Sequence, residues 1–281
     1  MKKAYNFKKM FIYILPCLVC FMITFIVPFI SGIGLSFFEW KSTIKSAKFV
    51  GFENYLIAFR DKYFIKSFFF TFRFVLVSVV SVNLIAFFFA LILTSKIPLR
   101  NFFRTIIFMP NLIGGVILGY IWQIIINAVF YNFNVSVGSN ENLGFFGLVL
   151  VVNWQLIGYM MVIYIASINT ISKDLIDSSK VDGANFIQRL KNIIIPSVMP
   201  SITICLFLTI INTFKLFDVN LALTNGGPNR RTEMLAFNII HTIFSERLPG
   251  VGLAKGVIFF IIIGWISSLQ IKFTRKKEVE N

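Results

Sequence analysis

The sequence predicts an all-α membrane protein with six transmembrane helices. Composition is the first reason, because 57% of the 281 residues are hydrophobic and only 14% are charged, whereas a soluble domain is nearer half apolar and a quarter charged. Distribution is the second, since the apolar residues gather in runs of the roughly 20 residues that cross a bilayer. The runs fall at about 11–38, 69–94, 103–129, 145–171, 193–217 and 251–272.

The first run is too long for the core of a signal peptide, and no small-residue cleavage site follows it. We therefore expect a retained helix, bent at Pro16 and Pro28 where neighbouring helices can satisfy the freed carbonyls. Residues 39–66 are expected to form an external segment. Because the six runs hold most of the chain, residues 1–281 are expected to form a single transmembrane domain.

The third and fifth runs contain residues that interrupt helices. Pro110, Asn111, Gly114 and Gly115 favour a broken or closely packed third helix, since small residues let helix backbones approach each other. In the fifth run, Pro196 and Pro200 are expected to kink the entry of the helix.

The net charge is +15, from 27 basic and 12 acidic residues. These charges follow the loops between apolar runs, so we expect no nucleic-acid partner. With the N-terminus inside, 15 Lys and Arg residues fall in cytoplasmic segments and nine in external ones. Because cytoplasmic loops carry the excess of Lys and Arg, this bias predicts that both termini are cytoplasmic.

Residues for cofactor or metal chemistry are scarce. Cys17 and Cys20 lie inside an apolar run without a second ligand pair, so we interpret them as small packed hydrophobes. His241 is the only histidine, and no phosphate-binding Gly-x-x-x-x-Gly-Lys-Ser/Thr motif occurs. We expect no cofactor, no metal and no enzymatic activity in this chain.

A polar segment, 172–192, separates the fourth and fifth runs. Ser172 is a candidate helix cap, and Gly183 permits a sharp turn. After the turn, one helix face would be apolar through Phe186, Ile187, Leu190 and Ile194. The segment is therefore either a docking knob for a partner or an ordinary basic loop with a surface helix.

The spacing within this segment resembles a family motif. Asp177-Ser178-Ser179 precedes Asp182-Gly183-Ala184, and nine residues separate Gly183 from Ile193, with Pro196 three residues further on. This is similar to the coupling-helix motif of binding-protein-dependent ABC importer permeases, Glu-Ala-Ala-x-x-x-Gly, nine residues, then Ile-x-Leu-Pro. Asp for Glu keeps the charge, and Ser for Ala keeps the side chain small.

Further stretches resemble the carbohydrate-uptake branch of that family. They are Phe49-Val-Gly-Phe-Glu-Asn-Tyr55, Phe217-Asp218 and Leu223-Thr-Asn-Gly-Gly-Pro228. The resemblance, which covers nearly the whole chain, implies a sugar-importing permease subunit in the bacterial cell membrane. It implies as partners a second homologous permease in a heterodimer, two ABC ATPase subunits that use ATP and Mg, and an extracytoplasmic solute-binding protein, all around a lipid bilayer. The implied ATPase-coupling residues are Asp177, Ser178, Ser179, Asp182, Gly183 and Ala184.

Polar and aromatic residues within the runs form a candidate substrate path. Rings that stack on sugar faces and amides that bond hydroxyls would suit a carbohydrate, although hydrogen bonds between helices explain such residues equally well. Lys215 and Asp218, at i and i+3, can instead form a structural ion pair, and Arg73 can snorkel to the interface. The path candidates are Trp122, Asn153, Trp154, Asn212, Lys215 and Asp218.

Two other classes of protein stay open as alternatives. A secondary carrier would work without an ATPase, but carriers coupled to protons usually need intramembrane carboxylates, which are almost absent here. A membrane enzyme or scaffold would need a polar cluster at one depth, and none is evident in the sequence. Which sugar would be carried is not given by these residues.

Overall fold

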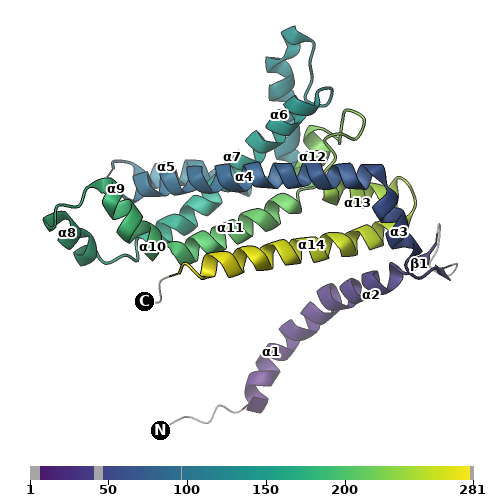
Figure 1. The fold of residues 1–281 in the computed structure, drawn as a ribbon, viewed down its shortest axis with the longest axis horizontal. Coiled ribbons are helices and arrows are strands. Elements are labelled where there is room, and N and C mark those ends of the chain that lie inside the picture. Colours follow the sequence, from purple (N-terminus) through teal and green to yellow (C-terminus); the bar gives the residue numbers. More distant parts are fainter. Residues whose placement is uncertain (1–6, 41–46, 96, 279–281) are drawn as a thin grey trace. The chain divides into compact units, whose positions relative to one another are not determined.

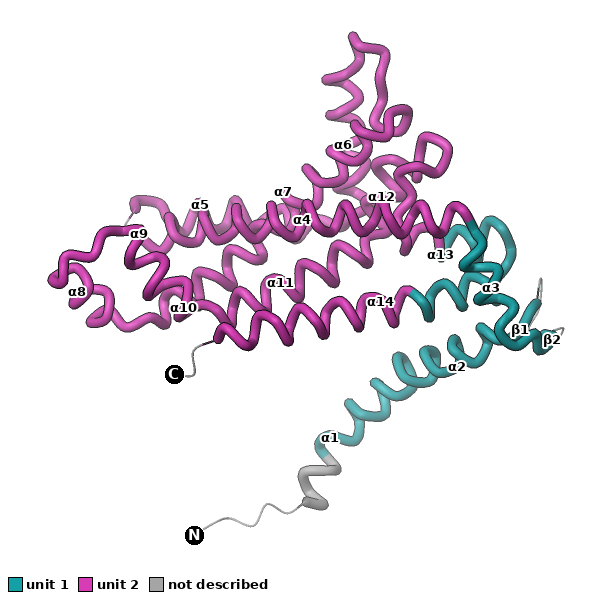
Figure 2. The backbone as a smooth tube through the Cα atoms, in the orientation of Figure 1, with its two compact units in different colours: residues 1–61, 239–258 teal, residues 62–238, 259–281 magenta. Residues whose placement is uncertain are grey.

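The computed structural model describes residues 7–40, 47–95 and 97–278, which are helical apart from one small sheet. Figure 1 shows the elements in chain order, and Figure 2 shows the two compact units into which the chain divides. The first unit comprises residues 1–61 and 239–258, and the second comprises 62–238 and 259–281. The expected single domain is thus made of two compact units.

The N-terminal helix of the first unit contains an irregular turn before its second proline. α1 (Phe7–Phe21) passes into a π-helical turn, η1 (Met22–Ile26), and then into α2 (Val27–Leu35). Pro28 lacks an N–H, and its ring crowds the carbonyl four residues earlier. A wider π turn directly before it accommodates both effects. The helix ends at Leu35, short of the predicted 38, and the hydroxyl of Ser36, the next residue, donates to the Ile33 carbonyl at 2.6 Å.

The expected external segment 39–66 is an ordered structure in its described part. Strand β1 (Phe38–Glu39) pairs antiparallel with β2 (Lys48–Phe49), and α3 (Glu53–Arg60) follows. Asn54 of α3 donates hydrogen bonds of 2.8 and 3.0 Å to the carbonyls of Ser36 and Phe38. These bonds tie α3 to the chain between the end of α2 and the start of β1.

The second unit holds most of the helices, and Figure 1 labels them. α13 (Leu235–Phe244) and α14 (Pro249–Arg275) contribute residues to both units. The other elements are α4 (Lys62–Thr94), α5 (Arg100–Phe108), η3 (Met109–Leu112), α6 (Gly115–Val129), η4 (Tyr131–Phe133), α7 (Glu141–Ile168), α8 (Lys173–Val181), α9 (Phe186–Arg189), η5 (Leu190–Ile194), α10 (Ile195–Ser197), α11 (Met199–Phe214) and α12 (Asp218–Leu223).

Four described helices are long and apolar enough to cross a membrane: Tyr13–Leu35, α4, α7 and α14. The third and fifth runs are helix pairs instead, bent by 101° between η3 and α6 and by 70° between α10 and α11. The expected breaks are therefore confirmed, at Pro110 to Gly115 and near Pro196 and Pro200. Since each pair is either a broken span or a re-entrant segment, the count of six stays a prediction.

Several helices differ in extent from the approximate apolar runs. α4 starts at Lys62 rather than 69, α7 at Glu141 rather than 145, and α14 runs from Pro249 to Arg275 rather than 251–272. Helical hydrogen bonds continue past the apolar run into polar turns, which a hydropathy window omits. α11 ends at Phe214, not 217, and the polar stretch after it contains the unpredicted helices α12 and α13.

The core of the second unit lies between α4, α7 and α11. A hydrogen-bond network joins the three helices there. Tyr164 of α7 donates to Asn83 Oδ1 of α4 at 2.8 Å, and Asn83 Nδ2 donates to Thr209 Oγ1 of α11 at 3.1 Å. All three side chains are buried, so the network fixes the three helices relative to one another.

The cysteines are free thiols in the described structure. Cys205 is buried in the core, but Cys17 and Cys20 are exposed on their unit, so the expectation that they are packed is wrong within this chain. Both lie on the N-terminal helix, whose described side chains are mostly exposed within the first unit.

We expect Gly158→Ala to destabilise the protein strongly. A Cβ at Gly158 would lie 2.1 Å from the carbonyl oxygen of Ile107, a backbone atom of α5 that cannot rotate away. Gly264→Ala is the matched control, because no heavy atom lies within 4 Å of its added Cβ, and alanine is the better helix former. The midpoint temperature of thermal unfolding in detergent should fall for Gly158→Ala only. Equal midpoints for the two variants would contradict the close contact.

Candidate functional site

The segment 172–192, which we call the coupling segment, lies at one end of the second unit (Figure 1). α8 and α9 form a helical pair joined by a turn at Gly183, whose φ is +79°. The Ala184 amide donates to the Ser179 carbonyl at 2.9 Å, and the Gly183 amide donates to Lys180 at 3.1 Å. This pair of bonds is the Schellman ending of a helix, which places a left-handed residue, usually glycine, at this position.

The second helix of the segment is fixed by a capping box. Asn185 Oδ1 accepts from the Gln188 amide at 2.9 Å, and Gln188 Oε1 accepts from the Asn185 amide at 2.7 Å. These reciprocal bonds satisfy amides at the start of α9. Ser172 occupies the N-cap position of α8 but makes no side-chain capping bond, so its predicted role is wrong in this structure.

Several apolar side chains are exposed on the otherwise polar coupling segment. Val181 is 87% exposed, Ile187 71% and Phe186 55%, although the segment as a whole is polar. Exposed apolar patches of this kind mark interaction sites in otherwise polar surfaces. Of the four residues of the predicted apolar face, Phe186 and Ile187 lie on α9 and are exposed, whereas Leu190 and Ile194 lie in the π-helical turn η5 and are half-buried.

The predicted coupling residues divide between the surface and the interior of the segment. Ser179 is buried, whereas Asp177, Ser178, Asp182 and Gly183 are exposed and Ala184 is half-buried. Lys180 donates to Asp177 at 2.6 Å, and this hydrogen bond holds the pKa of the Asp177 carboxyl below its usual range. Asp177 is therefore ionised at neutral pH and accessible to a partner.

A cavity of about 470 Å³ lies between α7, α11 and the chain before α12. Three predicted path residues line it together: Asn212, Lys215 and Asp218. Asn111 and Gln155, which the sequence analysis did not select, add two more amides. A cavity with several amides, a cation and a carboxylate has the groups that bond hydroxyls.

The remaining path candidates do not line this cavity. The rings of Trp122 and Trp154 pack edge to face on each other with centroids 5.5 Å apart. Asn153 Nδ2 donates to Ser81 Oγ at 2.8 Å, so its amide joins two helices. The alternative of hydrogen bonding between helices thus describes Asn153, whereas Asn212 lines the cavity while donating to its own helix.

Lys215 and Asp218 form no ion pair in the described structure. The proposed pairing assumed one continuous helix, but α11 ends at Phe214 and α12 begins at Asp218. Asp218 Oδ1 instead accepts from the amide of Val219 at 2.9 Å.

Comparison with known proteins gives consistent matches. The profile of the binding-protein-dependent transport system inner membrane component family matches residues 82–276. A probable starch degradation products transport system permease protein of Thermoanaerobacterium thermosulfurigenes is 44% identical over 99% of each chain. A multiple sugar-binding transport system permease protein of Streptococcus mutans is 28% identical over 93% of each. Among solved structures, a bacterial alginate ABC transporter, in complex with alginate pentasaccharide-bound periplasmic protein, has a chain with a TM-score of 0.80. Its sequence identity is 19%, and the match covers 95% of this chain and 94% of that chain.

The sequence analysis did not single out a buried lysine of α14. Lys255 of α14 is 1% exposed, and its Nζ donates to Asp61 Oδ2 at 2.6 Å and to Thr242 Oγ1 at 2.7 Å. All three residues belong to the first unit. A lysine inside the apolar run 251–272 is a signal the sequence does carry, since intramembrane charges are rare and usually paired.

We expect unequal effects from breaking this pair. Asp61→Ala leaves Lys255 charged and buried, so it should cost about 3–5 kcal/mol of unfolding free energy. Lys255→Met should cost less, because Asp61 keeps some contact with solvent. The double variant should be no less stable than Lys255→Met alone. Unfolding in mixed detergent micelles measures the three values, and additive losses would contradict a direct pair.

Proposed function

We infer that this chain, which belongs to the binding-protein-dependent transport system inner membrane component family, is the permease subunit of an ATP-driven importer of a sugar or sugar derivative. The family match covers residues 82–276. The relative that is 44% identical is named a probable starch degradation products transport system permease protein. We propose a starch degradation product, a short α-glucan, as the substrate of this chain as well.

The observation that carries this proposal is the coupling segment. It presents Val181, Phe186 and Ile187 around a rigid turn, with an ionised Asp177 nearby. Such a projection fits a groove on a partner better than it fits a free loop, because exposed apolar side chains gain free energy on burial. We propose that the partner is an ABC ATPase, and that each of two ATPase subunits receives one such segment.

The proposed cycle uses the segment as a lever. ATP-driven closure of the two ATPases moves the coupling segments, and the spans then rock from an inward-facing to an outward-facing arrangement. Hydrolysis resets them. α7 enters the segment and α10–α11 leave it, and the network of Asn83, Tyr164 and Thr209 makes α4, α7 and α11 move together.

The other partners follow from the same proposal. ATP and Mg belong to the ATPase subunits, and a second homologous permease completes the path as a heterodimer. An extracytoplasmic binding protein delivers the sugar; the periplasmic protein bound to the alginate transporter supports this role. Both termini are cytoplasmic, since 15 Lys and Arg residues then lie inside and nine outside, which puts the coupling segment on the side of the ATPases.

We propose that the sugar passes through one cavity, which is lined by Asn111, Gln155, Asn212, Lys215 and Asp218. Amides and carboxylates bond hydroxyl groups, and small sites of this kind combine an apolar wall with a few polar groups. Val152, Leu156 and Phe217 supply the apolar wall.

The direct test is uptake into liposomes containing the purified complex of this chain and the proteins that co-purify with it. We expect uptake of labelled malto-oligosaccharide to require ATP and the binding protein, and to survive an uncoupler. A chain that purifies without an ATPase and transports without ATP would instead be a secondary carrier.

Substitution of Gly183 tests the coupling segment. Gly183→Leu should abolish uptake while the protein stays in the membrane, because a left-handed backbone costs an ordinary residue about 1–2 kcal/mol and the docking shape would change. Gly183→Asn is the matched control, since asparagine tolerates this conformation, and it should keep most of the uptake. Uptake at the wild-type rate by Gly183→Leu would reject the assignment.

Substitutions in the cavity test the substrate path. Asn212→Ala and Asp218→Asn should each raise the sugar concentration needed for half-maximal ATPase stimulation by about tenfold, since a lost hydrogen bond to a buried polar group costs about 1–3 kcal/mol. Asn153→Ala, which alters a predicted path residue outside the cavity lining, should leave that concentration unchanged. If Asn153→Ala raised this concentration while Asn212→Ala and Asp218→Asn did not, the substrate path would lie outside this cavity.

A further inference from the structure

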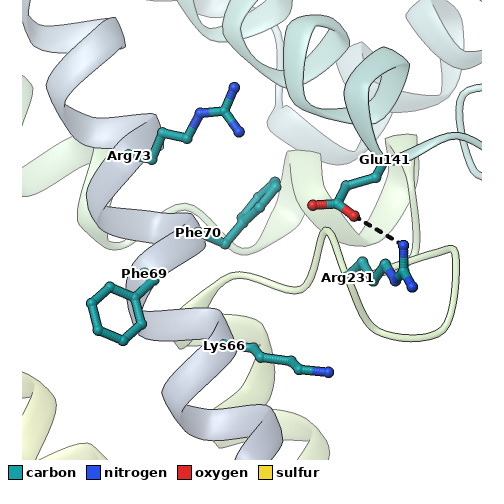
Figure 3. Close-up of a pocket in the computed structure, with 6 residues that line it drawn as sticks. All are labelled: Lys66, Phe69, Phe70, Arg73, Glu141 and Arg231. Atoms are coloured by element: carbon teal, nitrogen blue, oxygen red, sulfur yellow. Dashed lines mark hydrogen bonds and ion pairs between the residues drawn. The ribbon is translucent and has the colours of Figure 1, made fainter.

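A second cavity, of about 440 Å³, lies in the second unit between α4, the start of α7 and the loop before α13 (Figure 3). Charged residues dominate its lining, and none of them belongs to the cavity proposed for sugar. The six lining residues are Lys66, Phe69, Phe70, Arg73, Glu141 and Arg231.

The cavity carries excess positive charge. Its three cations face one carboxylate, which leaves a net charge of +2. Glu141 is 3.4 Å from Arg231, as the dashed line in Figure 3 shows. Among the described residues Lys66 and Arg73 form no ion pair, and the Arg73 guanidinium lies over the ring of Phe145 at 4.4 Å. Two cations are thus held beside one cavity without a counter-charge.

The length of α4 sets the depth of this cavity in the membrane. Residues 74–94 form an uncharged stretch of 21 residues that ends with the helix, which matches the roughly 30 Å of a hydrocarbon core. Arg73 is the last charged residue before that stretch, and Lys66 lies two turns further out. Both cations therefore lie where the headgroups of lipids lie.

An apolar surface continues from the cavity along α4. Phe69 lines the cavity and is 64% exposed, and Leu76, two turns deeper, is also exposed. A ligand with an anionic head and a hydrocarbon tail matches this order of charge, then aromatic ring, then aliphatic surface. A soluble anion would use only the first part.

We propose that this cavity binds the phosphate group of an anionic phospholipid, held between Lys66, Arg73 and Arg231, with an acyl chain along Phe69 and Leu76. The shared chemistry is a phosphate, so inorganic phosphate is the competing source. The site adds a lipid ligand to the proposed importer, and it requires only that α4 spans the membrane.

Lipid retention by the purified complex tests the proposal. Nanodiscs with equal phosphatidylglycerol and phosphatidylcholine are dissolved in mild detergent, and native mass spectrometry counts the lipids that stay bound. We expect preferential retention of phosphatidylglycerol, reduced about fivefold for each cation neutralised in Lys66→Gln and Arg73→Gln. Arg73→Lys should keep the preference because it keeps the charge. Lys62→Gln, an exposed lysine of α4 that does not line the cavity, is the matched control.

A phosphate arm distinguishes the two sources. Thermal unfolding is followed in lipid-free detergent with added phosphatidylglycerol or with inorganic phosphate, and we expect stabilisation by the lipid at far lower concentrations. Equal protection by inorganic phosphate, without retained phosphatidylglycerol, would overturn the lipid assignment. If Lys66→Gln and Arg73→Gln kept the wild-type lipid retention but lost stimulation of ATPase activity by the binding protein, the lipid assignment would also be overturned. The cavity would then be a protein-docking site.

Discussion

The buried network of Tyr164, Asn83 and Thr209 is the interaction on which the second unit depends. Helices in lipid gain little from apolar contact alone, because lipid tails are as apolar as their side chains, so packing and polar bonds between helices select the arrangement. Here one asparagine satisfies partners on two other helices. α7 precedes the coupling segment and α11 follows it in the chain, so the bonds that hold the core tie together the helices on either side of that segment.

Close glycine contacts shape the cavity between α7 and α11. A Cβ on Gly115 would lie 1.9 Å from the Asp218 carboxylate, and one on Gly119 would lie 2.6 Å from the side chain of Ala222. α12 can therefore lie directly against α6, which brings Asp218 to the cavity wall. The break before α6 and the contact with α12 are two results of the same glycine-rich stretch.

The sequence predicted helical class, both broken runs and the helix–turn–helix form of the coupling segment, because apolar runs, prolines and Gly183 act locally. It also placed Asn212, Lys215 and Asp218 among the path residues, and these share one cavity. It could not predict that Asn153 bonds Ser81, or that Lys215 and Asp218 lie on separate elements, since these depend on packing between distant segments. Asn54, in the stretch Phe49–Tyr55 that resembles sugar-uptake permeases, has a structural role: its amide donates to the carbonyls of Ser36 and Phe38, just after α2.

The burial of Lys255 separates two kinds of electrostatic contact by their response to ionic strength. Dissolved ions screen exposed charges beyond about 10 Å at 0.1 M salt, but they do so far less for buried pairs. The Lys255–Asp61 contact, with its nearly inaccessible ammonium group, is therefore weakened by salt far less than an exposed pair. The contact between Arg231 and Glu141, whose side chains are both exposed, weakens as salt rises. Rising salt would therefore change the charge balance around α4 more than it changes the Lys255–Asp61 contact.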